Sequence, residues 1–524
     1  MGKRITIGII DEIKEMIYSR VTEHAKGLRY LCYADIRIEA DEGRWAVAEN
    51  GSEKLSGSDY GFSFGVRVLA GEGCVAPGYF GQRLGSADLD QLKGRLEEGL
   101  EHAYRRALAN AEGKSTARER FGPLGEALYN ASLAPIEVCQ DVVPATYRVD
   151  PRTVPLDEMV RTTTEASRSV KGLDLQVKFN AVSTQTMLIR QLFCSSEGAN
   201  IDQSFALTEG MLYVVAQGDR GEPQELYDYI GHQRGWEVIA QGVQEESIRF
   251  PNLMDFCLGL ARDAVELSNS PPLRATDHEV VVVTNPHYNA LKVHEILGHP
   301  TELDRALKME TSYAGRTWLL RSLEENQIGK PIASPLVNAF SDPSLPGYGH
   351  YRYDDEGTPA RKVMHIEKGI FKGFMNSRQT AAILGELPNG SYKANDASVV
   401  PLIRMSNTVF APGERDPQEI LREVDHGYYL VGHRIPSIAE SRENFRITAM
   451  KVYEIRHGQL GQLFSNGGIM ADTKDYLMKV DAVGNDFQLF PIPNCGKGQP
   501  MQTKRLGNGG PTMRSRARLT GITS

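Results

Sequence analysis

The chain has 524 residues, several times the length of a typical domain, so it has room for two domains that each bury a core. Hydrophobic residues make up 41% and charged residues 24% of it, which is typical of a folded globular protein and excludes a disordered or fibrous one. The net charge of -8 is spread without long blocks of one sign and argues against a nucleic-acid partner.

Two further features concern the cell compartment. No apolar stretch approaches the roughly 18 residues that a membrane-spanning helix needs, and the first residues lack the apolar core and cleavage site of a secretory signal. The six cysteines lie far apart with no CxxC pair, as expected of reduced thiols. We therefore expect a cytoplasmic protein with no membrane partner.

The first half of the chain combines helices with strands whose apolar and polar residues alternate. Helices are predicted over residues 10–27, 86–112, 156–169 and 253–270. Strands are predicted over residues 33–40, 45–51, 61–71 and 73–81, followed by a series of antiparallel strands over 173–218. Loop signals cluster in SNSPPLRATDHE and place a domain boundary near residue 270, which gives domains 1–270 and 271–524.

The second half opens with the β-branched strand EVVVVT and continues into a helix over residues 285–299. Farther on, short strands are predicted to form hairpins that turn at Lys368-Gly369 and at His457-Gly458. The pattern predicts an α+β fold. Its N-terminal α/β domain would hold an antiparallel sheet and long helices, and its C-terminal domain would be mainly antiparallel β and carry the helix over 285–299.

That helix contains a motif with metal-binding chemistry. His294, Glu295 and His299 place two imidazoles and a carboxylate within six residues, which suits a zinc ion and a water-activating base. The spacing is one residue longer than in HExxH, and residues five apart on a regular helix diverge by about 140°. The two rings therefore reach one metal only if the helix widens or ends there, which Gly298 would favour. The alternative is a pair of histidines on a helix surface.

A catalytic zinc needs a third protein ligand. Cys495 lies in PIPNCGKGQPMQ, whose glycines and prolines indicate a tight loop, and a thiolate is a strong zinc ligand. A lone cysteine is more often structural, so its residue type alone leaves both readings open. A thiolate with two imidazoles favours zinc over other divalent ions.

Three blocks of sequence together carry a resemblance to a known family. HEILGHPTELDRA, YDDEGTPARKVMHIEKGIFKGFMNSRQTAAILG and NCGKGQP resemble the signature blocks of the TldD/PmbA family of metallopeptidases. The resemblance is strong over residues 279–511. It extends more loosely over the first half, where YADIRIEA, GFSFGVRVLAGEG and the long helix after them follow that family's order.

The resemblance implies that His294, His299 and Cys495 are zinc ligands and that Glu295 is the catalytic glutamate. It also implies a dimer, formed with a second copy or with a related TldE/PmbA-type subunit, that admits only small or unfolded peptides. Because the ligand motif is intact, the chain is similar to the metal-bearing TldD type. Residues 433–458 depart from the strand expected there in the bacterial TldD type, which leaves substrate and partner open.

The predicted function is zinc-dependent hydrolysis of peptide bonds, with Glu295 taking a proton from the attacking water and returning it to the leaving amine. Oxyanion or substrate contacts are expected from His350, Tyr351 or Arg404, among which the spacing does not choose. Two acidic residues that match family positions could orient the histidines, or could equally be helix caps; they are Glu302 and Asp304.

Extended peptides are commonly recognised by pairing with a sheet edge, which predicts weak sequence preference. One alternative function is a noncatalytic peptide-binding subunit, although a purely structural metal site would need no glutamate base. A second is a regulatory protein of a toxin–antitoxin or nucleic-acid-linked system, which the acidic charge balance does not favour.

Overall fold

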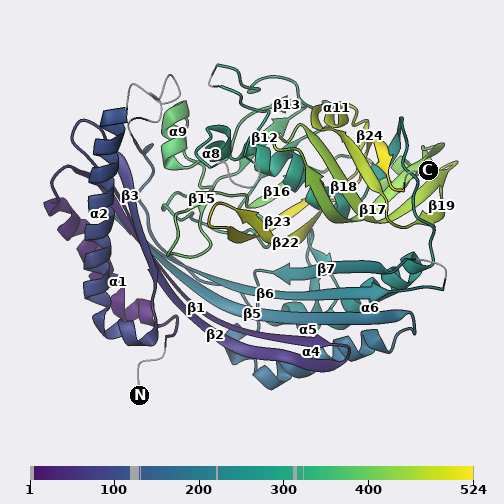
Figure 1. Cartoon of the computed structure of the whole chain (residues 1–524), viewed down its shortest axis with the longest axis horizontal. Helices are drawn as coiled ribbons and strands as arrows, with labels where there is room; N and C mark the ends of the chain where they lie inside the picture. Colours follow the sequence, from purple (N-terminus) through teal and green to yellow (C-terminus); the bar gives the residue numbers. More distant parts are fainter. Residues whose placement is uncertain are drawn as a thin grey trace.

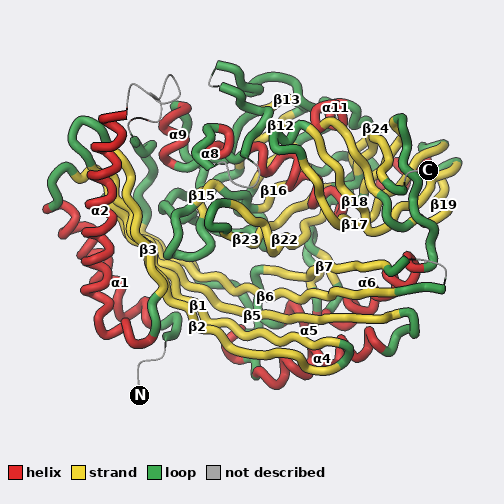
Figure 2. The backbone as a smooth tube through the Cα atoms, in the orientation of Figure 1, coloured by secondary structure: helices red, strands yellow, loops and turns green. Residues whose placement is uncertain are grey.

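The computed structural model describes residues 5–117, 129, 131–219, 222–310, 315–322 and 324–522. The first half of the chain forms one long, curved sheet with helices along its outer side, and the second half lies on the opposite side of that sheet (Figures 1 and 2). The arrangement is of the predicted α+β class, with helices concentrated in the first half. Within the described residues, no helix is both long and apolar enough to cross a membrane.

The sheet of the first half has the strand order β3-β2-β1-β5-β6-β4, and β7 also pairs with β6. The strands are β1 (Leu31–Glu49), β2 (Ser52–Ala70), β3 (Ala76–Arg83), β4 (Gln140–Val143), β5 (Val177–Ser195), β6 (Asn200–Ala216) and β7 (Gln224–His232). All pairings except that of β4 with β6 are antiparallel. Three of these strands have 19 residues each, so a single sheet extends under most of the molecule.

The two strands predicted over residues 33–40 and 45–51 are wrong as separate elements, because both belong to β1. β1 is paired with β2 on one side and β5 on the other. Hydrogen bonds to both neighbours keep the chain extended through its polar middle. The turn that follows has φ values of 49° at Asn50 and 84° at Gly51, the left-handed conformation that an Asn-Gly turn adopts.

Helices cover the outer side of this sheet in two groups. They are α1 (Ile9–Ser19), α2 (Leu92–Ala117), α4 (Leu156–Lys171), α5 (Glu237–Gln241) and α6 (Leu253–Ser268). The leucine stripe of α2 is core, as its spacing predicts: Leu92, Leu96 and Leu100 are 4%, 2% and 2% exposed. The helix predicted from residue 86 begins instead as a 3-10 turn over Ser86–Gln91.

The second half builds two further sheets with a helix packed between them. One sheet contains β10 (Glu279–Thr284), β17 (His426–Ile438), β18 (Asn444–Arg456), β19 (Gln459–Phe464), β20 (Gly468–Asp472), β21 (Ala482–Val483) and β24 (Met513–Thr520). The other contains β11 (Ala339–Ser341), β12 (Val363–Glu367), β13 (Ile370–Phe371), β16 (Asn407–Phe410), β22 (Gln488–Lys497) and β23 (Gln502–Gly510). Helix α7 (Pro286–Val293) contacts β17 of the first sheet and β22 and β23 of the second.

Both hairpins predicted in the second half are present. The turn between β12 and β13 has positive φ at Lys368 and Gly369, and that between β18 and β19 has positive φ at His457 and Gly458. Two successive left-handed residues give the turn whose twist matches the flanking strands. Most pairings here are antiparallel, but β10 with β17 and β16 with β23 are parallel.

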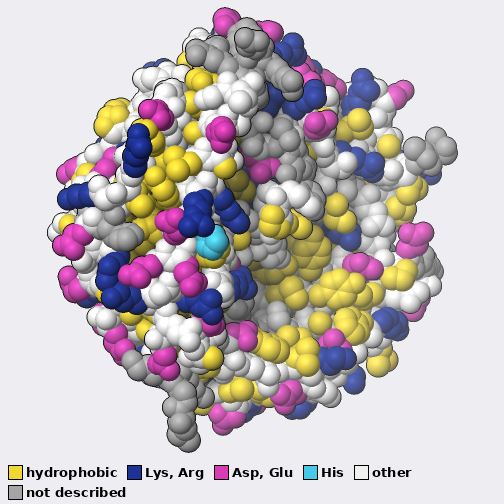
Figure 3. Space-filling model, turned by 60° about the vertical axis from the view of Figure 1, so that its left-hand side comes forward, with side chains coloured by type: hydrophobic (Ala, Val, Ile, Leu, Met, Phe, Trp, Pro, Cys, Tyr) yellow, Lys and Arg dark blue, Asp and Glu magenta, His cyan; other side chains and the backbone are white. Residues whose placement is uncertain are grey.

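Buried ion pairs connect the two halves of the chain. Arg67 of β2 lies 2.6 Å from Asp35 and 2.9 Å from Glu356, and Arg37 of β1 lies 3.3 Å from Asp355. On the face shown in Figure 3, Lys and Arg side chains are interspersed with Asp and Glu. Neither sign of charge therefore dominates that face. The buried charges between the two halves are paired.

Candidate metal centre

The helix that carries the two histidines changes its geometry at the first of them. Asn285 caps α7 by accepting a hydrogen bond from the N–H of Tyr288. From His294 to Gly298 the chain forms a π-helical turn, and the N–H of His299 donates to the carbonyl of His294. Because a π turn connects residues five apart, it brings the two imidazoles to the same side, as the spacing of the motif required.

Cys495 of β22 completes a cluster with these two histidines. All three side chains are buried, and their ligating atoms lie within 4.8 Å of one another. The imidazole rings are 4.7 Å apart at 88°, and the Cys495 Sγ lies 3.6 Å from the His299 Nε2. A tetrahedral zinc with ordinary Zn–N and Zn–S bond lengths separates its nitrogen and sulfur ligands by about 3.6 Å. The three donors therefore fit a zinc ion.

The second nitrogen of each imidazole has its own partner. The His294 Nδ1 lies 3.0 Å from the Asn508 Oδ1, and the His299 Nδ1 lies 3.0 Å from the Glu302 Oε2. Such contacts fix the ring orientation and leave the Nε2 atoms free for a metal. Asp304 has a different role, because its carboxylate accepts hydrogen bonds from Lys497 and from the N–H of Ile403 rather than from a histidine.

The Glu302 carboxylate is kept ionised although it is fully buried. Burial alone would raise its pKa, but Lys497 at 3.2 Å, His299, and Arg305 at 3.0 Å hold the pKa well below its usual value. A charged acceptor strengthens the hydrogen bond to His299. Glu302 thereby provides negative charge directly behind a candidate ligand.

Glu295 forms an ion pair with Arg442, which lies in the turn between β17 and β18. The two side chains are 13% and 7% exposed, and the Arg442 backbone is left-handed, with φ at 63°. Burial acts to raise the pKa of Glu295, but Arg442 and the two imidazoles bring the pKa below its usual value. Glu295 is thus ionised, as a general base must be before it accepts a proton.

The charges of Cys495 and His294 depend on each other. Burial disfavours the Cys495 thiolate, but His294, His299 and Arg404 outweigh it and hold the thiol pKa well below its usual value. Burial likewise disfavours the charged imidazole of His294, yet the Cys495 thiolate raises the pKa of His294 to about 9. A cysteine that ionises so readily is suited to metal ligation.

The three residues expected to contact an oxyanion or substrate make other contacts. The Arg404 guanidinium donates to the backbone carbonyls of Gln502 and Cys495. Tyr351 donates its hydroxyl to the Gly390 carbonyl, and the His350 Nδ1 lies 2.7 Å from the Pro343 carbonyl. Arg404 therefore supports the strand that carries Cys495, while the other two side chains are engaged with loops.

Comparisons with known proteins agree with this fold and site. Residues 277–519 match the family model of the PmbA/TldA metallopeptidase C-terminal domain. A metalloprotease of Methanocaldococcus jannaschii is 26% identical over 491 residues, which cover 93% of this chain and 97% of the relative. A metalloprotease of Methanothermobacter thermautotrophicus is 30% identical over 377 residues, covering 71% and 76% of the two chains.

Among solved structures, TldE from Thermococcus kodakarensis superimposes with a TM-score of 0.66. The match covers 95% of this chain and 99% of that one at 17% identity, so it shows a shared fold. The family model and the named relatives place this α+β protein in the class of metallopeptidases, and its buried His/His/Cys cluster could hold the metal. The chain is a member of the PmbA/TldD family of metallopeptidases.

Reasoning from sequence missed two residues of this site, Arg442 and Asn508. Arg442 lies within residues 433–458, the segment that departs from the family pattern, but nothing in its surroundings indicates contact with Glu295. Asn508 lies on β23, which follows the cysteine strand in the chain. Its position beside His294 depends on the register of two strands, which the sequence does not specify.

Proposed function

We propose that this chain is the metal-bearing type of subunit and that it acts as a zinc-dependent peptidase on small or unfolded peptides. The observation that carries the proposal is the buried cluster of His294, His299 and Cys495 with the ionised Glu295 beside it. Two imidazoles and a thiolate favour zinc among the divalent ions. When bound, zinc would lower the pKa of a water molecule and polarise the peptide carbonyl.

The residues of the chain perform the proton transfers. Glu295 accepts the proton of the attacking water and then delivers it to the leaving amine. Asn508 and Glu302 hold the two imidazoles in place through their Nδ1 atoms. Arg442 keeps the Glu295 carboxylate ionised through their ion pair.

A peptide would be held through its backbone. β22, which carries Cys495, is an edge strand of its sheet, and β7 is an edge strand of the sheet in the first half. The two edges contact each other where Asn494, next to Cys495, donates to the Tyr229 hydroxyl, so a peptide would pair with the part of an edge outside this contact. A peptide added to such an edge is recognised by main-chain hydrogen bonds, so we expect cleavage with weak sequence preference. Sharp selectivity for one side chain in a peptide library would contradict this mode of binding.

Two further expectations complete the proposal. We propose that the chain divides into domains 1–270 and 271–524. We also propose that it acts as a dimer, with a second copy or with a related TldE/PmbA-type subunit, and light scattering of the purified protein would distinguish a self-associated dimer from a monomer that awaits a partner. A noncatalytic peptide-binding or regulatory subunit is the alternative, and the intact base Glu295 argues against it.

The test compares the parent protein with Glu295→Gln. The substitution removes the base but leaves the three ligands, so we expect equal zinc content and a loss of peptide hydrolysis of at least about a hundredfold. Glu101→Gln is the matched control, since Glu101 is 45% exposed on α2. If neither protein binds zinc, the ligand assignment is wrong. If both bind it and neither cleaves an unfolded peptide, the isolated chain is not a peptidase.

A further inference from the structure

A cavity lies between the two halves of the chain, next to the metal centre. It is partly open to solvent and leaves about 80 Å³ for the centres of water-sized molecules. Strands β1, β5 and β6 form one wall, and β23 with the loop around Tyr351 forms the other. Its apolar lining consists of Ile189, Phe205, Leu207, Tyr351 and Met405.

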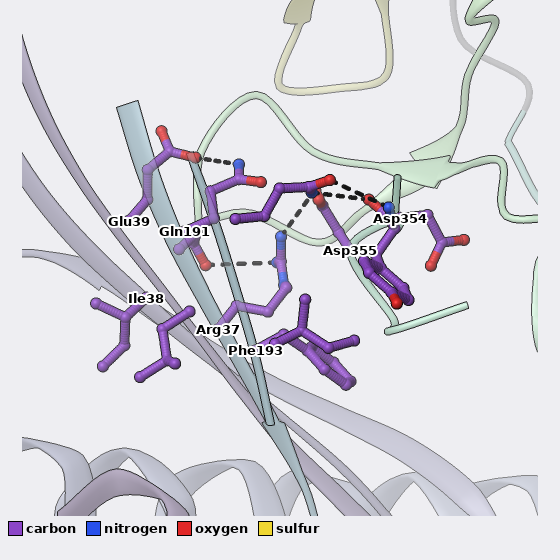
Figure 4. A pocket seen from close by; sticks show the side chains of 12 residues that line it. Arg37, Ile38, Glu39, Gln191, Phe193, Asp354 and Asp355 are labelled. Carbon is purple, nitrogen blue, oxygen red and sulfur yellow. Dashed lines mark hydrogen bonds and ion pairs between the residues drawn. The ribbon is translucent and has the colours of Figure 1, made fainter. Parts of the chain in front are cut away.

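Two opposite charges in this lining lack an ion-pair partner among the described residues. Glu39 is 6% exposed, and its carboxylate accepts only a 2.5 Å hydrogen bond from the Gln191 amide, a contact that Figure 4 shows from the neighbouring pocket lined by Arg37 and Asp355. The Lys504 ammonium donates to the Ala394 carbonyl at 2.7 Å. Burial raises the pKa of Glu39 to about 7, although the charge of Lys504 acts to lower it, so the two groups influence each other without forming an ion pair.

The other charges of the lining are already neutralised. Lys393 lies 2.8 Å from Asp355, and Arg505 lies 3.1 Å from Glu209. Glu39 and Lys504 are thus the two charges of the lining that remain available to a ligand, one of each sign. Buried charges are costly unless they are paired, so a ligand that pairs both would be bound strongly for its size.

From this arrangement we infer that the cavity binds a small zwitterion with an apolar side chain, either a free α-amino acid or a dipeptide. Its ammonium would contact Glu39, its carboxylate would contact Lys504, and its side chain would lie against Phe205, Leu207 and Met405. Peptide hydrolysis yields ligands of this class, so the inference extends the proposed function, although binding itself requires no catalysis.

The cavity also adjoins the helix turn that bears the ligands. A Cβ added at Gly298 would lie 2.0 Å from the Met405 Sδ, so Met405 separates the cavity from the π turn. An occupant would therefore lie one side chain away from that turn. This placement suits a product site, or a site through which a product inhibits the enzyme.

The first experiment is calorimetric titration of the full chain carrying Glu295→Gln, after treatment with a chelator, so that no ligand is hydrolysed. The probes are L-leucine, N-acetyl-L-leucine, L-leucinamide, N-acetyl-L-leucinamide and the dipeptide leucyl-glycine. We expect saturable binding with one site for L-leucine, leucyl-glycine or both, and at least tenfold weaker binding when either charge is blocked. Equal binding of all four leucine derivatives, or binding of no zwitterion, would overturn the inference.

Single variants then assign the two charges. Lys504→Met and Glu39→Gln should each weaken binding of the zwitterion at least tenfold, whereas Lys54→Met and Glu101→Gln, both at exposed positions, should leave it unchanged. Should Lys504→Met or Glu39→Gln fail to fold, the titration of Glu295→Gln with the leucine derivatives still tests the inference. The tighter of L-leucine and leucyl-glycine identifies the occupant. The titrated variant lacks the base Glu295 and has been treated with a chelator. Absence of ligand binding to it would therefore not bear on the peptidase proposal.

Discussion

The ion pair between Arg442 and Glu295 affects the residue on which the proposed chemistry depends. A carboxylate next to a guanidinium ionises at lower pH, so the pair extends the acidic range in which Glu295 can accept a proton. The turn that presents Arg442 is held by hydrogen bonds from the Thr473 hydroxyl and from the N–H of Trp318. A left-handed backbone at a non-glycine residue is costly and persists only where its surroundings enforce it.

Replacing Arg442 should change the pH dependence of hydrolysis. Arg442→Gln removes the positive charge that lowers the pKa of Glu295, so we expect the acid limb of the kcat/KM profile to move to higher pH, while Arg442→Lys preserves most of it. The measurement is kcat/KM against pH for a peptide substrate. Arg456→Gln, on the same hairpin but 69% exposed, is the control. An unchanged acid limb in Arg442→Gln would mean that the pair does not persist in the working enzyme.

The contacts behind the histidines should control metal affinity. Asn508→Ala removes the acceptor that orients His294, and Glu302→Gln removes the negative charge of the acceptor that orients His299, so we expect zinc affinity to fall by about 10–100-fold in each case. Competition with a chromogenic chelator measures this directly. Asn485→Ala, in a loop of the second half, tests whether loss of any asparagine has the same effect. Parent-like zinc affinity in both variants would show that the contacts of the two Nδ1 atoms do not affect zinc binding.

At the scale of the element, the π turn is what converts the motif into a site. Gly298 lies in this turn against Met405, where there is no space for a side chain. The turn therefore depends on a glycine for packing rather than for backbone freedom, since its φ of -55° suits any residue.

Gly298→Ala should disturb both stability and metal binding. A Cβ would lie 2.0 Å from the Met405 Sδ, so we expect the free energy of unfolding to fall by about 1–3 kcal/mol and zinc affinity to fall with it. Gly259→Ala, in α6, is the matched control, because a Cβ there meets nothing within 4 Å. Denaturant unfolding gives the stability of both variants. Equal stability of the two would show that Met405 moves aside freely.

Sequence reasoning succeeded where local chemistry determines structure. The spacing of His294 and His299 predicted that the helix widens or ends there, and it widens into a π-helical turn; the Lys368-Gly369 and His457-Gly458 pairs predicted hairpins that are present. It was wrong where pairing between distant strands determines the structure. β1 is an example, because pairing with β2 on one side and β5 on the other keeps its polar middle in the strand. Cys495 was identified through family resemblance rather than through its own surroundings, and Arg442 was not identified at all. Strand pairing places Cys495 at the site, and the turn between β17 and β18 places Arg442 there.

At the scale of the whole molecule, buried ion pairs connect the long sheet to the part of the chain that holds the site. Asp355 illustrates the connection. Its carboxylate lies 2.8 Å from Lys393 and 3.3 Å from Arg37, and it is 4% exposed. Burial opposes ionisation, yet Lys393 and Arg37 lower the pKa of Asp355 to about 2.

Asp355→Asn should therefore destabilise the folded protein in a pH-dependent way. Breaking a buried pair costs about 3–5 kcal/mol, which we expect as a lower free energy of unfolding at pH 7. Because the folded pKa lies below the usual 3.8, the charge stabilises the fold above that pH, and this stabilisation disappears as pH falls toward 2. Parent and variant should converge over that window. Asp277→Asn, at a position 99% exposed, should match the parent throughout.

The separation in sequence between the two histidines and Cys495 determines when the cluster can form during protein synthesis. Cys495 follows His299 by 196 residues, and ribosomes add roughly 5–20 residues per second, so the thiol is made about 10–40 s after the histidines. Strand β10, which leads into the ligand helix, likewise pairs with β24, made later still. A nascent chain therefore carries only two of the three candidate ligands until β22 has been made, and the complete cluster can form only near the end of synthesis.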